Sequence, residues 1–307
     1  MQLHYYRDLL GNFGDDLNPV LWRRFLPGVI DGVPGTVLIG IGTLLGGEFP
    51  DGTRKVVMGA GTGYGPPPRL DATWDVRFVR GPMTAAALGL PPDRAIADPA
   101  ILVGDLLPPA PAPAVRTAGP VLFIPHHVSA RFMRWRRVCR LAGLEYADPT
   151  GPPLRVARQI QSARLVLTEA MHGAIIADAL RVPWIGVAIY PHINRFKWQD
   201  WLAAMELVAE LHEIPPLLDG WHTNRLHNAR LAARAARRSR QLWPLRGLGP
   251  PDLPAADRPA DAPERMAAAL RRAAALDPAL SRDAVHRDRL ARVRGEVLRF
   301  RQEQPVS

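Results

Sequence analysis

Short apolar runs rich in Val and Ile recur from the N-terminus to about Leu217, and each is followed by a Gly or Pro break and often by a helical pattern. These runs predict strands at Leu3–Tyr6, Val37–Ile41, Val56–Met58, Val76–Val79, Ile96–Ile101, Val121–Ile124, Leu165–Leu167 and Trp184–Ile189. The intervening segments predict helices at Asp16–Phe25, Met83–Leu88, Ala130–Ala142, Leu154–Ala163 and His172–Leu180. Alternation of strands with helices is typical of parallel sheets covered by helices, so the pattern predicts an α/β fold.

A proline-rich segment, Pro108–Pro113, is a linker candidate because prolines stiffen the backbone and lack N–H donors. It divides the chain into an N-terminal α/β domain, residues 1–107, and a C-terminal α/β domain, residues 118–217. Residues 218–307 form an Arg/Ala-rich extension with helices predicted at Arg230–Leu242, Ala262–Leu276 and Arg282–Gln302. Few large apolar residues occur in this extension, so we expect it to pack as an appendage.

Composition excludes several classes of protein. The single cysteine, Cys139, cannot form an intrachain disulfide, and no Cys/His cluster has structural-zinc spacing. The start of the chain lacks a signal-peptide pattern, and no apolar stretch is long enough to span a membrane. We therefore expect a cytoplasmic protein without a metal.

The net charge of +10 is concentrated in the extension, where residues 221–307 contain 18 Arg, no Lys and 9 acidic residues. This pattern fits a solvated helical face. It also fits a surface attracted to anionic lipids, which would make the protein peripheral on the inner membrane. No nucleic-acid motif occurs and aromatic residues are sparse among the arginines, so we expect no nucleic-acid partner.

The loop after the first strand, Gly11–Pro19, contains candidate ligand contacts. Such loops lie at the carboxyl ends of parallel strands, where α/β proteins bind ligands. Asp15 or Asp16 could simply cap the following helix. Alternatively, Asn12 and one carboxylate hydrogen-bond sugar hydroxyls, or Asp15 acts as a base.

Two glycine-rich stretches, Gly40–Gly47 and Gly59–Gly65, follow strands but depart from the dinucleotide fingerprint at Leu45 and Tyr64. They fit a backbone that bends around a cleft or approaches a ligand. Arg80, at a strand end, could bind a carboxylate or phosphate through two hydrogen bonds, or could form a surface ion pair.

The most informative segment is Thr168–Leu180, in which an apolar strand ends in Thr168-Glu169 and His172 falls in the first turn of a small-residue helix. Free N–H groups at a helix N-terminus attract anions, so a phosphate beside His172 is physically reasonable. Histidine titrates near neutrality and can deliver a proton to a substrate. A structural role is the alternative.

Further candidates follow the neighbouring strands. Arg195 and Lys197 could neutralise a small dianion, while Trp198 and Trp201 either stack on a sugar or pack in the core. His126 and His127 end the strand Val121–Ile124. Without a third ligand we expect them to contact substrate or backbone rather than a metal.

Taken together, these motifs resemble the polysaccharide pyruvyltransferase family, particularly members acting on exopolysaccharides such as xanthan and succinoglycan. The matching pieces run in family order between about Leu3 and Leu207 and are Asn12-Phe13-Gly14-Asp15-Asp16-Leu17-Asn18, Gly59–Gly65, Val79-Arg80-Gly81, Asp98-Pro99-Ala100, Glu169-Ala170-Met171-His172-Gly173 and Phe196-Lys197-Trp198-Gln199-Asp200-Trp201. The resemblance implies two Rossmann-like domains that face a cleft, as in GT-B glycosyltransferases.

The resemblance also implies pyruvyl transfer from phosphoenolpyruvate to two hydroxyls of one sugar in a lipid-linked oligosaccharide or polysaccharide, with a cyclic ketal and phosphate as products and no cofactor. We expect His172 as the acid and Asp15 as the group that orients or deprotonates the acceptor. Expected donor contacts are Arg80, Glu169, Gly173, Arg195, Lys197 and His126, and expected acceptor contacts are Asn12, Gly14 and Asp16. Ala170 stands where many members have Arg, so Arg80, Arg195 or Lys197 must bind the donor carboxylate.

Two other functions share this pattern. A glycosyltransferase using a nucleotide sugar would have the same architecture, because fold does not fix chemistry. A non-catalytic carbohydrate-binding protein is the other, with Ala170 as the mark of a decayed site.

Overall fold

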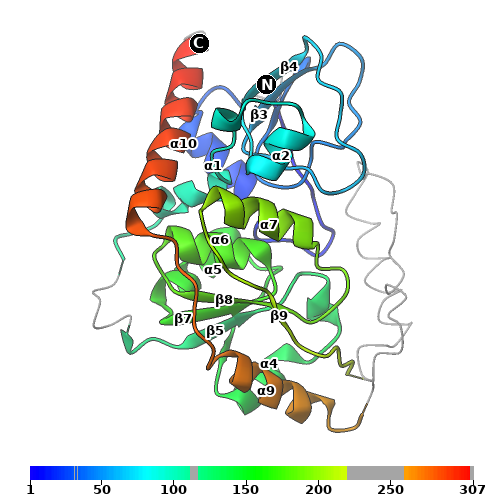
Figure 1. Cartoon of the computed structure of the whole chain (residues 1–307), viewed down its shortest axis with the longest axis vertical. Coiled ribbons are helices and arrows are strands. Elements are labelled where there is room, and N and C mark those ends of the chain that lie inside the picture. Colours follow the sequence, from blue (N-terminus) through cyan, green and yellow to red (C-terminus); the bar gives the residue numbers. More distant parts are fainter. Residues whose placement is uncertain (31, 33, 111–116, 220–258, 305–307) are drawn as a thin grey trace.

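The computed structural model describes residues 1–30, 32, 34–110, 117–219 and 259–304. Two parallel sheets, each flanked by helices, lie one beyond the other along the long axis of the molecule (Figure 1). This confirms the predicted α/β fold with parallel strands.

The first sheet is built from four strands paired in chain order, all parallel. They are β1 (Gln2–His4), β2 (Thr36–Ile39), β3 (Arg54–Met58) and β4 (Trp74–Phe78). Alternate residues of β2 and β3 enter two different apolar clusters, so both faces of the sheet are covered, as parallel sheets require. The accompanying helices are α1 (Leu17–Phe25), α2 (Pro82–Ala87), η1 (Pro92–Arg94) and η2 (Pro99–Leu106), the last two being 3-10 helices.

The second sheet has the strand order β6-β5-β7-β8-β9. Its strands are β5 (Val121–Ile124), β6 (Glu145–Tyr146), β7 (Leu165–Thr168), β8 (Trp184–Ala188) and β9 (His212–Glu213). Its helices are η3 (Ser129–Arg131), α4 (Trp135–Ala142), α5 (Pro153–Ser162), α6 (Met171–Ala179) and α7 (Arg195–Ala204). The chain leaves β5 towards β6 on one side and later returns to β7 on the other, so the order reverses between β5 and β7. Open α/β sheets bind ligands at such a switch point.

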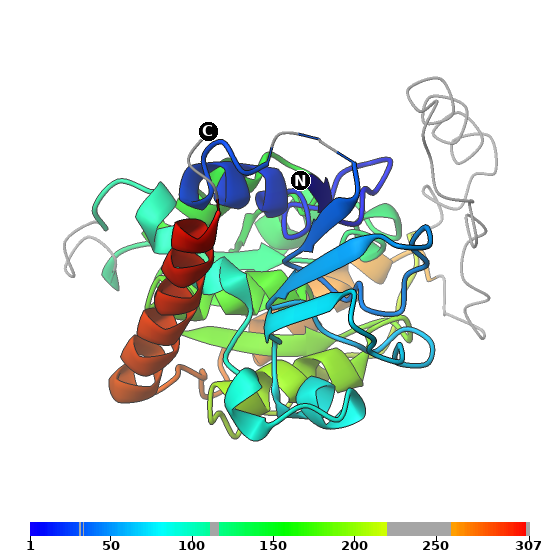
Figure 2. The ribbon, with the colours of Figure 1, turned by 90° about the horizontal axis from the view of Figure 1, so that it is seen from above.

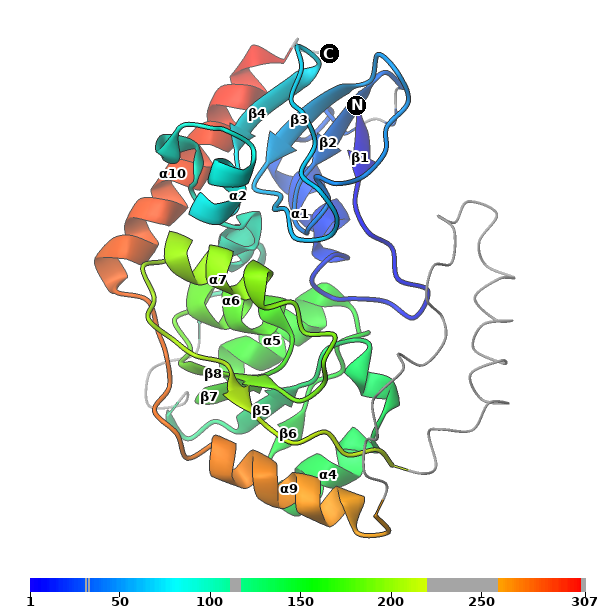
Figure 3. The same cartoon turned by 45° about the vertical axis from the view of Figure 1, so that its right-hand side comes forward.

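Two helices follow near the C-terminus, α9 (Ala262–Ala273) and α10 (Asp283–Glu303). Helix α9 packs on α4, whereas α10 runs beside the first sheet (Figures 2 and 3). The buried residues include Met266 and Leu270 of α9 and Val297 and Phe300 of α10. The expectation that these helices bury little and form an appendage was therefore wrong. No helix within the described ranges is both long and apolar enough to cross a membrane.

Other predictions need correction. Ile96–Ile101 is not a strand, because Pro99 begins η2 and the Asp98 side chain caps that helix. The expected helix Ala130–Ala142 is interrupted between η3 and α4. The two-residue strands β6 and β9 were not predicted. The predicted helix Arg230–Leu242 and the linker residues 111–113 lie outside the described residues.

The two halves meet through helices. Helix α6 of the second half packs against η2 of the first, and α7 packs against α2. Apolar residues of both halves share one core cluster, among them Leu38, Leu102 and Ile175.

Candidate active site

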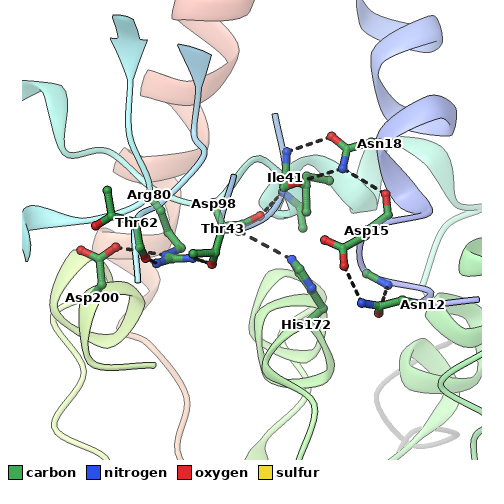
Figure 4. A network of polar contacts seen from close by, with 12 residues as sticks. Asn12, Asp15, Asn18, Ile41, Thr43, Thr62, Arg80, Asp98, His172 and Asp200 are labelled. Atoms are coloured by element: carbon green, nitrogen blue, oxygen red, sulfur yellow. Dashed lines mark hydrogen bonds and ion pairs between the residues drawn. The ribbon is translucent and has the colours of Figure 1, made fainter. Parts of the chain in front are cut away.

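Asn18 fixes the loop between β1 and α1 against the end of β2. Its fully buried side chain donates from Nδ2 to the carbonyls of Asp15 and Ile41, and its Oδ1 accepts from the Ile41 N–H and the Trp22 indole (Figure 4). The loop that carries Asn12, Gly14 and Asp15 is therefore held in one position relative to the sheet.

Asp15 is buried, and its carboxylate accepts a hydrogen bond from Nδ2 of Asn12. Burial raises the pKa of Asp15 to about 6, although the charges of His172 and Lys197 act to lower it. A carboxyl group with this pKa can take up and release a proton near neutral pH.

Asp16 occupies the N-cap position of α1, but its side chain makes no cap hydrogen bond. Its Oδ2 instead accepts from the backbone N–H of Asn12 at 3.0 Å. Burial raises the pKa of Asp16 above its usual range. Asp16 therefore stabilises the loop through a hydrogen bond to its backbone. Its side chain does not cap α1.

His172 lies in the first turn of α6 and faces the first half of the chain (Figure 4). The residue is 9% exposed, and its ring sits so close to Gly14 that a Cβ added there would lie 2.1 Å from Nδ1. Its Nε2 is 3.7 Å from Oδ2 of Asp98. The ring thus has a loop and a carboxylate of the first half as neighbours.

Glu169 is fully buried, and both of its carboxylate oxygens accept hydrogen bonds from backbone amides. Oε2 accepts from the N–H of His126, and Oε1 accepts from those of Ile189 and Tyr190. Burial raises the pKa of Glu169 to about 7, and these hydrogen bonds oppose the shift. Glu169 therefore ties the ends of β5, β7 and β8 together.

Gly173 allows α6 to begin close above β7. A Cβ at this position would lie 2.3 Å from Oγ1 of Thr168. Glycine at this position therefore lets the helix lie close to its own strand, and the contact of Gly173 with the donor stays a prediction.

Three histidine rings gather after β5 and β8. The ring of His126 lies 4.2 Å from that of His127 and 4.9 Å from that of His192, measured between centroids. Burial lowers the pKa of His127 to about 4, against the opposing charge of Asp8, and burial also lowers that of His192 to about 4. The cluster is therefore neutral at physiological pH and can donate or accept hydrogen bonds. Within the described ranges, no three His, Cys, Asp or Glu side chains are arranged to hold a metal ion.

Arg80 is fully buried and joins the two halves. Its Nε donates to Oδ2 of Asp200 in α7 at 3.0 Å, while its two terminal nitrogens donate to Thr43 and to the carbonyl of Thr62. The surface ion pair considered from the sequence is thus an internal one. All three nitrogens have protein partners.

Arg195 and Lys197 differ in surroundings. Arg195 is exposed, pairs with Glu213, and lines a 510 Å³ pocket that also includes Tyr190 and Ile214. Lys197 reaches the first half, where Nζ donates to the hydroxyl of Tyr64 at 3.1 Å. Trp198 and Trp201 are both 2% exposed, which confirms the core alternative for these residues.

The structure brings together Asn12, Gly14, Asp15 and His172, with Lys197 close enough to influence the pKa of Asp15. It places Arg80 in a separate polar network, drawn on the other side of His172 in Figure 4.

Several buried polar residues near these groups were not among the predicted site residues. Asn18, Asp98 and Asp200 are among them. Asn18 lies one helical turn before Trp22 on the buried face of α1, a place where a polar residue needs hydrogen-bond partners. The sequence predicts Asp98 either as a carboxylate at a strand end or as part of a turn, and it does not show that Asp98 and Asp200 are buried.

The family model for polysaccharide pyruvyl transferases matches residues 54–190, a range that includes Arg80, Asp98 and His172. The succinoglycan biosynthesis protein ExoV of Rhizobium meliloti (strain 1021) is 42% identical to this chain over 218 residues, covering 70% of this chain and 68% of ExoV.

Proposed function

Because this chain belongs to the polysaccharide pyruvyl transferase family and is therefore a transferase, we propose that it transfers a pyruvyl group from phosphoenolpyruvate to a sugar. The proposed acceptor is an exopolysaccharide or another cell-surface glycan precursor carried on a lipid, in keeping with the name of ExoV as a succinoglycan biosynthesis protein. The products are a cyclic ketal and phosphate.

The observation that carries this proposal is the meeting of His172 with Asp15 between the two halves, at the N-terminal turn of α6. Protonation of the donor's methylene carbon by His172 creates an oxocarbenium-like centre that a sugar hydroxyl attacks. The two hydroxyls lose two protons in all: one replaces the proton given by His172, and the other leaves with phosphate. Asp15 accepts a hydroxyl proton on the way, which its raised pKa suits.

Phosphate leaves beside the free N–H groups of α6, which stabilise negative charge together with Lys197 and Arg195. Since each guanidinium nitrogen of Arg80 already has a partner inside the protein, Lys197 and Arg195 are the proposed replacements for the arginine absent at Ala170. The neutral His126 ring supplies a hydrogen bond to the donor. The two parallel sheets are compatible with a GT-B-like architecture. In this proposal the acceptor binds the first half and the donor the second.

The direct test is to incubate the purified protein with phosphoenolpyruvate and a lipid-linked oligosaccharide. Phosphate release and a product mass increased by pyruvate less one water are expected. A nucleotide-sugar glycosyltransferase would instead release nucleotide and leave phosphoenolpyruvate intact.

The replacement His172→Ala tests the acid. Turnover is expected to fall about 10²- to 10⁴-fold, the usual contribution of an acid–base group. Initial rates of phosphate release at saturating donor measure this loss. Near-normal turnover in the variant would remove His172 from the mechanism.

A cytoplasmic location at the inner membrane, where lipid-linked acceptors reside, also belongs to the proposal. Its basis is the basic C-terminal region, although several arginines of α10 are paired with acidic side chains, including Arg289 with Glu206 and Arg294 with Asp105. Sedimentation with liposomes at low salt should show more binding to anionic than to neutral vesicles, and equal partitioning would contradict it.

A further inference from the structure

Asp98 presents one unused carboxylate oxygen to the ring of His172. The carboxylate is completely buried, and neither its Oδ2 nor Nε2 of His172 has a hydrogen-bond partner, although the two atoms are only 3.7 Å apart. Buried polar atoms are normally satisfied, so such a facing pair needs an explanation. A small movement of the ring towards Asp98 would make a hydrogen bond.

The fold fixes Asp98 in this direction. The other oxygen, Oδ1, accepts from the N–H of Ala100 at 2.9 Å and thereby caps η2, while Pro99 begins the helix. Helix η2 packs directly against α6, which carries His172. One oxygen of Asp98 therefore accepts a hydrogen bond from the backbone that follows it. The other is directed towards His172 across the interface between the two halves.

The charges around His172 come from several elements. Asp98 precedes η2 and Asp15 precedes α1, and both carboxylates belong to the first half. His126 and His127 follow β5 in the second half, and their charged forms would repel an imidazolium, as would Lys197 of α7. The two carboxylates are thus the groups that can favour a protonated His172, and Asp98 is the one that faces Nε2.

We propose that Asp98 is a positioning residue that holds a proton on Nε2 of His172 and thereby keeps the imidazolium oriented for its role as acid. Nδ1, on the side of Gly14, then carries the proton that passes to the donor. Because Asp98 belongs to the first half and His172 to the second, the acid is complete only where the halves are in contact. This inference rests on the proposed function for its catalytic meaning, but not for its electrostatic part.

The test compares Asp98→Asn with the matched control Asp105→Asn, which removes a carboxylate from within η2 at a surface ion pair with Arg294. An asparagine oxygen can still cap η2, so the fold should persist. The NMR titration of His172, assigned with His172→Ala in the protein without donor, should move to lower pH by about one unit in Asp98→Asn. It should not move in the control.

In parallel, the alkaline limb of the pH profile of kcat should shift in the same direction, with little change in KM for phosphoenolpyruvate. An unchanged titration of His172 in Asp98→Asn would overturn the inference, even if turnover fell, because that pattern indicates a purely structural role. If the wild-type protein did not consume phosphoenolpyruvate, the proposed function would fail, while the NMR titration would still decide whether Asp98 acts on His172.

Discussion

At the interface between the two halves, some positions require glycine because a group from the other half occupies the space that the Cβ of any other residue would need. Gly14 faces the ring of His172, and Gly81 faces the backbone carbonyl of Asp200, which would lie 2.0 Å from an added Cβ. Interiors are too closely packed to absorb such overlaps without displacement. Glycines of the sequence motifs thus indicate contacts between segments far apart in the chain.

This argument predicts the effect of Gly14→Ala. The backbone of Gly14 lies outside the left-handed region, so alanine is conformationally allowed and the ring of His172 is the main obstacle. If His172 is the acid, turnover should fall about 10²-fold or more, towards the loss expected for its removal. Rates of phosphate release measure this effect.

The matched control for that variant is Gly104→Ala, since a Cβ there would meet only Leu180 at 4.0 Å. Its turnover should be that of the wild type. A Gly14→Ala variant with full activity would show that the position of His172 is not critical. Combining Gly14→Ala with His172→Ala should add little to the loss, because both changes remove the same group.

Asp15 predicts a dependence of stability on pH. Its folded pKa, about 6, lies above the unfolded value of about 3.8, so the folded state disfavours its charged form. The destabilisation is absent below about pH 3.8 and grows until it is complete above about pH 6. Asp15→Asn should therefore stabilise the protein, by roughly 1–3 kcal/mol at pH 8 and by about 1 kcal/mol less at pH 5.

Urea unfolding of both proteins at pH 5 and pH 8 measures this difference. The variant should also lose turnover, which identifies Asp15 as a functional group kept at the expense of stability. Equal stability of the two proteins at pH 8 would contradict the assignment.

At the scale of elements, the sequence predicts regular strands well and misses segments whose conformation depends on local caps. Val121–Ile124 is a strand with the predicted bounds, since a continuous apolar run is buried on both faces of a parallel sheet. Ile96–Ile101 is also buried, but it contains Asp98 and Pro99, which start a 3-10 helix within it. Burial alone could not distinguish these two segments, and the difference lies in the capping carboxylate and the proline.

The candidate site was predictable to the extent that its residues follow strands. His172, Asp15 and His126 each follow a strand of one of the sheets, and the motifs around them identified the family, which the comparisons confirm. The internal position of Arg80 was not predictable, because its partner Asp200 lies 120 residues further along the chain. Long-range pairing of this kind depends on how the two halves meet.

The hydrogen bonds of Asn18, which connect α1 to the end of β2, should contribute to the free energy of unfolding. Asn18→Ala would leave buried partners at Ile41, Trp22 and Asp15 without hydrogen bonds. The free energy of unfolding should fall by about 2–4 kcal/mol, since each unsatisfied buried group costs about 1–3 kcal/mol and some will find other partners. Urea unfolding measures the loss, with the exposed Gln199→Ala as control. A loss below about 0.5 kcal/mol would show that the loop is not held by Asn18.

At the scale of the whole molecule, polar contacts span the two halves at several places. Arg282, the N-cap residue of α10, pairs with Glu206 of the second half, and Arg294 of α10 pairs with Asp105 of the first. These pairs are at the surface, where each contributes at most about 1 kcal/mol. The pair Arg80–Asp200 differs, because both side chains are fully buried. Among these ion pairs, loss of Arg80–Asp200 should therefore destabilise the contact between the two halves most.

Arg80 provides the last prediction, which separates a donor contact from an internal connection. Arg80→Met alone leaves the buried Asp200 carboxylate with only its hydrogen bonds to Thr84. The free energy of unfolding should therefore fall by about 3–5 kcal/mol. The double variant Arg80→Met/Asp200→Leu removes both charges and should regain part of that stability.

If Arg80 connects the halves, the double variant also keeps a KM for phosphoenolpyruvate within a few-fold of the wild type. If Arg80 binds the donor carboxylate, KM rises strongly in the single and the double variant alike, whatever their stability. Urea unfolding and steady-state kinetics on the same three proteins therefore distinguish the two roles, and the full engagement of the guanidinium by Asp200, Thr43 and Thr62 favours the connection.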